Sequence, residues 1–327
     1  MLSEFRQDLV SGEWVLISTG RTHTVKKFED SYQSKDECPF EDWNILKQDL
    51  VTIIPGEINW RVAVIKNKYP AVMPGENVPE EKIGPFNIKK AVGEHEVIVF
   101  RDHDIRFYDF NLDQIAEAIN IYKQRYAALA QKDSKKYIMI FHNHGREAGA
   151  SIYHPHSQII TTPILPPDVA HSINGSFQYY KKHGKRVYDV LLDWELKEKK
   201  RIIYENDHFV VFCPFISKYP YEIRVFSKES HAHFDKMPDE LNQPLADALK
   251  FAIDKLGAVL NKPPFNFFIH TAPLESEFND LMHEYYQWHF EIIPHMKIDA
   301  GFEIGTGIEV NIIDPDEAAE KLRNVRL

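Results

Sequence analysis

The sequence lacks the features that mark secreted, membrane-spanning and nucleic-acid-binding proteins. Only two of its 327 residues are cysteine, Cys38 and Cys213, so it holds no disulfide framework. No apolar run is long enough to cross a bilayer, and the first residues, MLSEFRQDLVSGEW, are too polar for a signal peptide. The formal net charge of −10 argues against a nucleic-acid partner, which would meet a basic face. We therefore expect a cytoplasmic protein that binds neither membranes nor nucleic acids.

Histidine, in contrast, is plentiful, and four of the 16 histidines fall in one short stretch. Residues 142 to 160 read HNHGREAGASIYHPHSQII. Because residues at spacing two share one face of a strand, His154, His156 and Gln158 should point the same way, beside a glycine-containing turn. The backbone N–H groups of such turns bind anions, and histidine serves near neutral pH as base, nucleophile or ligand. The stretch therefore predicts chemistry at a phosphate.

The motif HPHSQ resembles the His-x-His-x-Gln signature of the nucleotidylyltransferase branch of the histidine-triad superfamily. The longer string, Asn143 followed by GREAGASIYHPHSQII, resembles galactose-1-phosphate uridylyltransferase and its relatives. The resemblance implies that His156 attacks the α-phosphorus of a nucleoside diphosphate sugar, and that an acceptor then discharges the nucleotidyl-histidine. It also implies that Gln158 and Asn143 hold the phosphate oxygens together with Gly149, Ala150 and Ser151.

The expected reaction is the exchange of UMP between UDP-glucose and galactose 1-phosphate, with ping-pong kinetics. The same motif also fits an ADP-sugar or dinucleotide phosphorylase. Two further alternatives are a nucleotide-sugar binding protein without catalysis and a metallohydrolase with the ligands His142, His144, His154 and His156. Because the family commonly forms homodimers with sites near the interface, the resemblance implies a homodimer.

The resemblance implies further substrate contacts near the N-terminus, at residues 67 and 68, and near the C-terminus. Arg21, after an expected hairpin over residues 4–19, matches a phosphate-binding arginine, although the family's second arginine is Thr24 here. Asn67 and Lys68 match a region that lies against the nucleobase. Three residues near the C-terminus match positions that contact the sugar phosphate or complete the site: Phe302, Glu303 and Glu309. A glutamine is usual at position 309, and a carboxylate there would repel phosphate, which leaves the acceptor open.

The string CPFE at residues 38–41 stands where the family has Cys-Pro-Phe-Cys, whose two thiolates bind zinc. Since a carboxylate can also ligate zinc, the resemblance implies a structural zinc site made of Cys38, Glu41, His103 and His154. A second metal site of the family would use His270, His289 and Glu291. Its remaining carboxylate is not evident, because Ser172 stands at the equivalent position. We therefore predict no well-occupied second metal.

The two halves of the sequence look like diverged copies of each other. VAVIKNKYPAV and VVFCPFISKYPYE both read as strands that lead into Lys-Tyr-Pro. Each half continues with a strand, a long amphipathic helix, an apolar strand and a histidine strand, which is YHPHSQII in one half and YQWHFEII in the other. This order favours an α+β fold over alternating parallel βαβ units. We expect tandem duplicated histidine-triad-like units over residues 1–195, which hold the catalytic residues, and 196–327, each an antiparallel sheet with a crossing helix.

Overall fold

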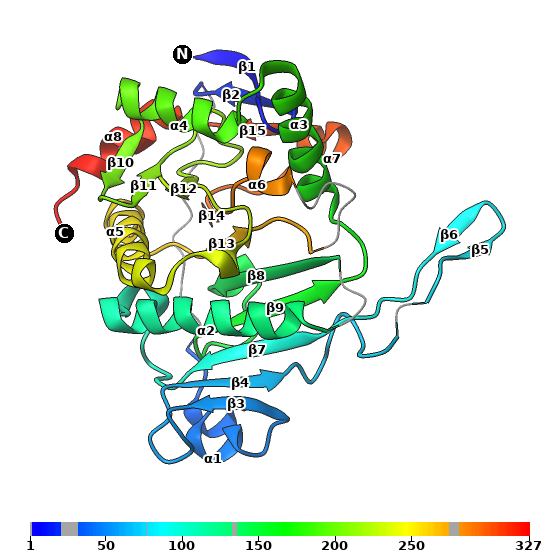
Figure 1. Ribbon diagram of the computed structural model, residues 1–327. Coiled ribbons are helices and arrows are strands. Elements are labelled where there is room, and N and C mark those ends of the chain that lie inside the picture. Colours follow the sequence, from blue (N-terminus) through cyan, green and yellow to red (C-terminus); the bar gives the residue numbers. More distant parts are fainter. Residues whose placement is uncertain (1, 21–31, 77, 133–135, 275–280) are drawn as a thin grey trace.

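A ten-stranded antiparallel sheet forms the centre of the computed structural model, which describes residues 2–20, 32–76, 78–132, 136–274 and 281–327 (Figure 1). The first half of the chain contributes β3 (Leu50–Ile54), β4 (Val62–Lys66), β7 (His95–Phe100), β8 (Tyr137–His144) and β9 (His156–Thr162). The second half contributes β10 (Ile202–Glu205), β11 (Phe209–Phe212), β12 (Ile223–Ser227), β13 (Phe265–His270) and β14 (His289–Pro294). The spatial order is β10-β11-β12-β14-β13-β8-β9-β7-β4-β3.

This strand order shows a duplication. In each half the last strand inserts beside the third, so that β9 lies between β7 and β8, and β14 lies between β12 and β13. The equivalent strands β8 and β13 pair antiparallel at the centre, where Asn143 lies opposite Asn266. An approximate two-fold axis therefore relates the two halves. The predicted α+β class and tandem duplication are confirmed, while the boundary between residues 195 and 196 stays a prediction.

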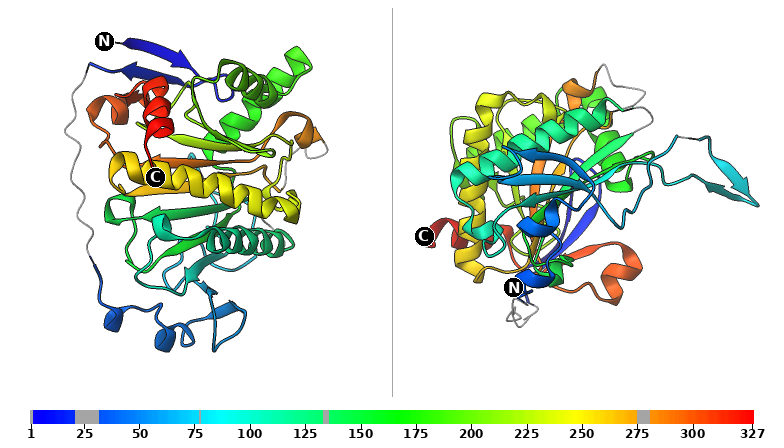
Figure 2. Two further views of the ribbon diagram at one scale, coloured as in Figure 1. Left: turned by 90° about the vertical axis from the view of Figure 1, so that its left-hand side faces the viewer. Right: turned by 90° about the horizontal axis from the view of Figure 1, so that it is seen from below.

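Two long helices cover one face of the sheet. They are α2 (Leu112–Ala130) and α5 (Asn242–Leu260), which lie side by side (Figure 2). Asn111 caps α2, since its side chain accepts the backbone N–H of Gln114 at 2.9 Å. Buried residues at helical spacing, among them Ile115, Ile119 and Tyr122, pack in one core with apolar residues of the strands. The largest core of the molecule lies here.

The opposite face of the sheet is covered at both ends. Over the second half, α3 (Pro167–His183) and α4 (Val187–Glu198) share a core with the strands, in which Tyr188 meets Phe226. Over the outer strands of the first half, the segment around α1 (Asp42–Ile45) buries Phe40 and Trp60 near Val99. The middle strands carry half-buried side chains on this face, and two large cavities lie beside them.

The remaining elements lie at the periphery. The predicted N-terminal hairpin is β1 (Ser3–Gln7) and β2 (Trp14–Ser18), and β15 (Glu309–Asn311) extends it in parallel. The short helices are α6 (Met282–Tyr285), α7 (Gly301–Thr306) and α8 (Pro315–Asn324). The strands β5 (Glu81–Ile83) and β6 (Phe86–Ile88) form an arm that projects far from the body (Figure 1). Among the described helices, none combines the length and apolarity that a bilayer crossing requires.

Candidate active site

The two histidines of the HPHSQ motif face the same side of the sheet. His154 and His156 are both buried, and the ring of Phe40 packs edge-on against both, with centroid distances of 5.8 and 5.4 Å. β9 begins at His156, directly after Pro155, and pairs with β7 and β8. The predicted histidine face is therefore present, and it is built on two flanking strands.

One hydrogen bond of the His156 ring determines which of its nitrogens keeps a lone pair. Nδ1 lies 2.8 Å from the backbone carbonyl oxygen of His154. Because a carbonyl oxygen only accepts, Nδ1 carries the proton and donates it, and Nε2 keeps its lone pair. Burial lowers the pKa of His156, although the bond to His154 opposes this shift. The ring is therefore neutral, and the His154 carbonyl holds it in one orientation.

Gln158 is oriented by His95, a residue that the motif analysis did not assign to the site. His95 Nδ1 accepts the backbone N–H of Ala71 at 3.2 Å, so its Nε2 carries the proton and donates to Gln158 Oε1 at 2.8 Å. The Gln158 amide group is thereby fixed with its oxygen toward His95, and its NH₂ group remains a donor. Asn67 also lies here, with Nδ2 3.2 Å from His95 Nε2. The only signal in the sequence was the position of His95 at the start of the strand GEHEVIVF.

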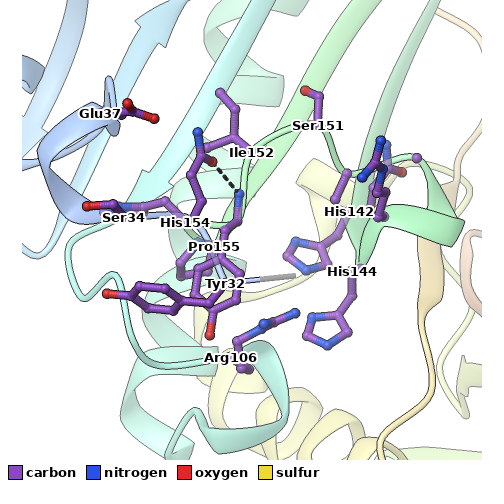
Figure 3. Close-up of a pocket in the computed structure, with 17 residues that line it drawn as sticks. Tyr32, Ser34, Glu37, Arg106, His142, His144, Ser151, Ile152, His154 and Pro155 are labelled. Carbon is purple, nitrogen blue, oxygen red and sulfur yellow. Dashed lines mark hydrogen bonds between the residues drawn. The ribbon is translucent and has the colours of Figure 1, made fainter. Parts of the chain in front are cut away.

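A turn with two left-handed glycines follows β8 and forms one wall of a cavity. Gly145 and Gly149 have φ of 84° and 88°, a region that favours glycine. The cavity has a volume of about 630 Å³. Its lining includes the predicted phosphate-binding residues Asn143, Gly149, Ala150 and Ser151, together with Arg106, which sequence reasoning missed (Figure 3). His156 and Gln158 do not line this cavity, although His154 and Pro155 do.

His142 and His144 have a different role from the HPHSQ pair. They lie one above the other on β8, beside Arg106 (Figure 3). Both are buried, and their rings stack on Phe267 and Phe265, at centroid distances of 5.1 and 5.0 Å. Burial holds the pKa of His142 well below its usual value and lowers that of His144 to about 3. Neither belongs to any metal-ligand cluster of the described residues, so the four-histidine metallohydrolase site is not formed.

The four predicted zinc ligands do converge. The ligand atoms of Cys38, Glu41, His103 and His154 lie within 4.8 Å of one another, and all four residues are buried. His103 Nε2 lies 2.8 Å from the Gln33 carbonyl oxygen, and His154 Nε2 lies 2.6 Å from that of Phe100. Both Nε2 atoms therefore donate to carbonyls, and both Nδ1 lone pairs face the cluster.

This arrangement leaves acceptors facing each other. His103 Nδ1 and Glu41 Oε1 are 2.8 Å apart, yet neither has a hydrogen-bond donor as partner. Two buried lone-pair atoms at this distance repel each other unless His103 is protonated or a metal cation lies between them and the other ligands. The cluster therefore fits a metal ion, and its thiolate, imidazole and carboxylate ligand set is one that zinc accepts.

The counterpart of the active site in the second half has a different charge. His289 Nδ1 lies 3.2 Å from the carbonyl oxygen of Gln287, as His156 does from that of His154. Glu291 stands in the place of Gln158, within 3.4 Å of His289 and 3.6 Å of His270. Arg224 pairs with Glu291 at 3.1 Å. Although burial opposes it, this guanidinium, together with His270, holds the pKa of Glu291 well below its usual range.

The ligand atoms of His270, His289 and Glu291 lie within 4.8 Å of one another, but the charges around them differ from those of the first cluster. The Glu291 carboxylate would repel a phosphate, and Arg224 already supplies a cation beside it. Ser172 lines the same cavity of about 790 Å³ as His270, but it offers no carboxylate. That the second metal site is not well occupied stays a prediction.

The other predicted substrate residues are more scattered. Arg21 and Thr24 lie outside the described residues. Lys68 is exposed beside Tyr69. Phe302 and Glu303 lie on α7, and Glu309 begins β15; none of them lines the two large cavities. Glu309 forms an ion pair with Lys297, which offsets the repulsion that a carboxylate at this position would exert on phosphate.

Both halves of the chain match models of one protein family. Residues 1–166 match the family model "Galactose-1-phosphate uridyl transferase, N-terminal domain", and residues 173–326 match that of the C-terminal domain. The chain belongs to this family. The resemblance that the HPHSQ region suggested is thus confirmed over nearly the whole sequence.

Relatives with two different activities are similar to the chain. An ADP-glucose phosphorylase of Arabidopsis thaliana is 32% identical, over 99% of this chain and 93% of its own length. A galactose-1-phosphate uridylyltransferase of Thermotoga maritima is 30% identical, over 100% and 99%. A crystal structure of an Arabidopsis thaliana ADP-glucose phosphorylase with bound ADP-glucose has a TM-score of 0.84 at 30% identity and covers 100% of both chains. The family and its enzymatic character are therefore shown for this chain, while the relatives differ in reaction.

Proposed function

We propose that the protein transfers a nucleotidyl group from a nucleoside diphosphate glucose through a covalent intermediate on His156. The observation that carries this proposal is the tautomer of His156, whose Nδ1–H is held by the His154 carbonyl while Nε2 keeps its lone pair. Nε2 attacks the α-phosphorus, the bond to the bridging oxygen breaks, and glucose 1-phosphate leaves. The Nδ1–H bond stabilises the positive charge that develops on the ring.

The acceptor then reverses the chemistry. An oxygen of the acceptor phosphate attacks the α-phosphorus, the P–N bond breaks, and neutral His156 is restored. Gln158 and Asn143 present amide donors to the phosphate oxygens as negative charge builds, and the backbone N–H of Ser151 adds to them, whereas those of Gly149 and Ala150 donate to carbonyls within the turn. The neutral state that burial favours keeps His156 nucleophilic.

For the donor and acceptor we favour ADP-glucose and inorganic phosphate. This choice rests on the 32% identity to the phosphorylase over 99% of the chain and on the TM-score of 0.84 with its ADP-glucose complex. The second candidate is the UMP exchange between UDP-glucose and galactose 1-phosphate that the motif first suggested. The family models and the Thermotoga maritima relative favour it.

We further propose that the cluster of Cys38, Glu41, His103 and His154 holds zinc. The facing lone pairs of His103 and His154 and the unpartnered Glu41 oxygen support this assignment. Zinc bound there would be structural, because it would tie the segment before α1 to the residue that holds the His156 ring.

We also propose the homodimer that the resemblance implies, with the arm of β5 and β6 as a contact between the two subunits. Ile83 and Phe86 on this arm are 63% and 69% exposed, and Tyr69 at its base is 81% exposed. Apolar side chains on a projecting two-stranded arm are expected to be covered by a partner. The cytoplasmic location stays a proposal as well.

Product analysis separates the two candidate reactions. The protein is incubated with ADP-glucose and phosphate, and in parallel with UDP-glucose and galactose 1-phosphate, and the nucleotides are separated by anion exchange. If ADP and glucose 1-phosphate form in the first mixture and the second mixture yields no product, the result supports phosphorolysis of ADP-glucose. UDP-galactose from the second mixture supports UMP exchange instead, and no product from either mixture contradicts both.

A further inference from the structure

Two residues of the second half, Asn266 on β13 and His295 just after β14, lie directly behind the glycine turn of the active site. We propose that Asn266, oriented by His295, is a positioning residue for nucleotidyl transfer. It fixes the Asn143 amide group so that its NH₂ group faces the phosphate, and it holds the turn at residues 145–149 in place through the Ala148 carbonyl. This inference rests on the proposed transfer through His156 and adds to it a role for the second half of the chain.

The hydrogen bonds of Asn266 admit one orientation of its amide group. Nδ2 lies 2.8 Å from the backbone carbonyl oxygen of Ala148 and 2.8 Å from Asn143 Oδ1. Because the Ala148 carbonyl only accepts, the NH₂ group must lie on this side, and one of its two hydrogens is available for each acceptor. Asn266 Oδ1 then faces His295 Nε2 at 2.5 Å, so this nitrogen carries the proton and donates it.

The orientation of Asn266 determines that of Asn143. Since Asn143 Oδ1 is occupied by the Asn266 donor, its NH₂ group is turned to the other side. Asn143 Nδ2 lies 3.6 Å from the point where a Cβ of Gly149 would stand, and both residues line the cavity of about 630 Å³. The Asn143 amide group thus offers hydrogens, and not its oxygen, to a bound phosphate.

The same segment also braces the turn itself. The backbone N–H of His295 donates to the carbonyl oxygen of Pro264 at 2.8 Å. Pro264 in turn packs so closely on Gly145 that a Cβ there would stand 2.9 Å from the Pro264 Cβ. Asn266 lies opposite Asn143 across the approximate two-fold axis, so the catalytic half receives this support from its non-catalytic copy. The second half therefore contributes a functional pair as well as a packing surface.

The decisive variant is Asn266→Asp, which keeps the size of the side chain and removes both donated hydrogens. With a carboxylate behind it, Asn143 is expected to turn its NH₂ group inward and its oxygen toward the phosphate. We expect the rate of nucleotidyl-His156 formation in a single turnover to fall about 100-fold, as for the loss of one oxyanion donor, with little change in the donor's Kd. Asn206→Asp is the matched control, because Asn206 is also a half-buried amide that donates to a backbone carbonyl, but it lies beyond β10 at the far edge of the sheet.

A double-mutant cycle with Asn143→Ala tests whether Asn266 acts through Asn143. The double variant should be only slightly slower than Asn143→Ala alone, because the group that Asn266 orients is already gone. Losses that multiply would overturn the inference, as would an Asn266→Asp protein with the wild-type rate.

Two substitutions of His295 keep the inference testable if Asn266→Asp does not fold. His295→Gln retains an N–H donor and should keep more of the rate than His295→Ala, and equal rates for the two would contradict the proposed orientation. A wild-type protein that forms no nucleotidyl-histidine from either ADP-glucose or UDP-glucose refutes the proposed function. If the wild-type protein forms the nucleotidyl-histidine and the variants form it at the same rate, only the positioning role is refuted.

Discussion

Ser157 on β9 is the middle link of a buried chain of hydrogen bonds, so its substitution should be costly. The Tyr122 hydroxyl lies 2.6 Å from Ser157 Oγ, and Ser157 Oγ lies 3.0 Å from His142 Nδ1. All three residues are at most 2% exposed. The His142 ring also bonds to the backbone of His156, so the chain ends at the proposed nucleophile. We predict that Ser157→Ala lowers the free energy of unfolding more than Tyr122→Phe does. It does so although it removes only one oxygen atom, fewer than most substitutions in the core remove.

The magnitudes follow from which groups lose their partners. Ser157→Ala leaves the Tyr122 hydroxyl and His142 Nδ1 without a partner, at about 1–3 kcal/mol for each, or about 2–6 kcal/mol in all. Tyr122→Phe removes one end of the chain and leaves Ser157 bonded to His142, so it should cost only about 1 kcal/mol. The double variant removes the hydroxyl that Ser157→Ala orphans. It should therefore be more stable than Ser157→Ala alone.

Equilibrium urea unfolding, followed by far-UV circular dichroism and by fluorescence, measures these free energies where the two transitions coincide. The reasoning predicts the stability order wild type, Tyr122→Phe, double variant, Ser157→Ala. A double variant that is less stable than Ser157→Ala by the full cost of Tyr122→Phe would refute the hydrogen-bonded chain, because the two effects would then be additive.

Three further predictions address the metal, the amide donor and the arm. Glu41→Ala should lower the zinc content measured by atomic emission and the thermal midpoint, whereas Glu41→Cys should retain zinc; equal zinc in both variants would speak against Glu41 as a ligand. His95→Ala should slow nucleotidyl transfer up to about 100-fold by releasing the Gln158 amide, and an unchanged single-turnover rate would show that Gln158 needs no such orientation. Phe86→Ser should shift the mass measured by light scattering from dimer toward monomer, and an undiminished dimer mass would place the contact elsewhere.

The duplicated fold was predictable because the signals repeat. Strand periodicity, two Lys-Tyr-Pro turns and two long amphipathic helices occur in the same order in both halves, and side-chain spacing alone places His154, His156 and Gln158 on one face. The capping residue Asn111 was also readable, since the side chain of a cap acts within its own turn.

The contacts that complete the site depend on pairings between distant strands, which local sequence does not encode. The approach of His95 to Gln158 requires β9 to insert beside β7, and that of Asn266 to Asn143 requires the two central strands to meet in one register. For the same reason the ion pair of Glu309 with Lys297 could not be placed from the sequence. The ligand set of the metal cluster came from resemblance, and the facing lone pairs that support it are visible only in three dimensions.

The covalent role of His156 is tested most directly by intact-protein mass spectrometry after mixing with ADP-glucose, in parallel with UDP-glucose. The account predicts a nucleotidyl adduct that maps to the peptide containing His156, is absent from His156→Ala, and disappears when phosphate or a sugar 1-phosphate is added. An adduct that persists in His156→Ala, or turnover of the sugar nucleotide by that variant at the wild-type rate, would contradict the account.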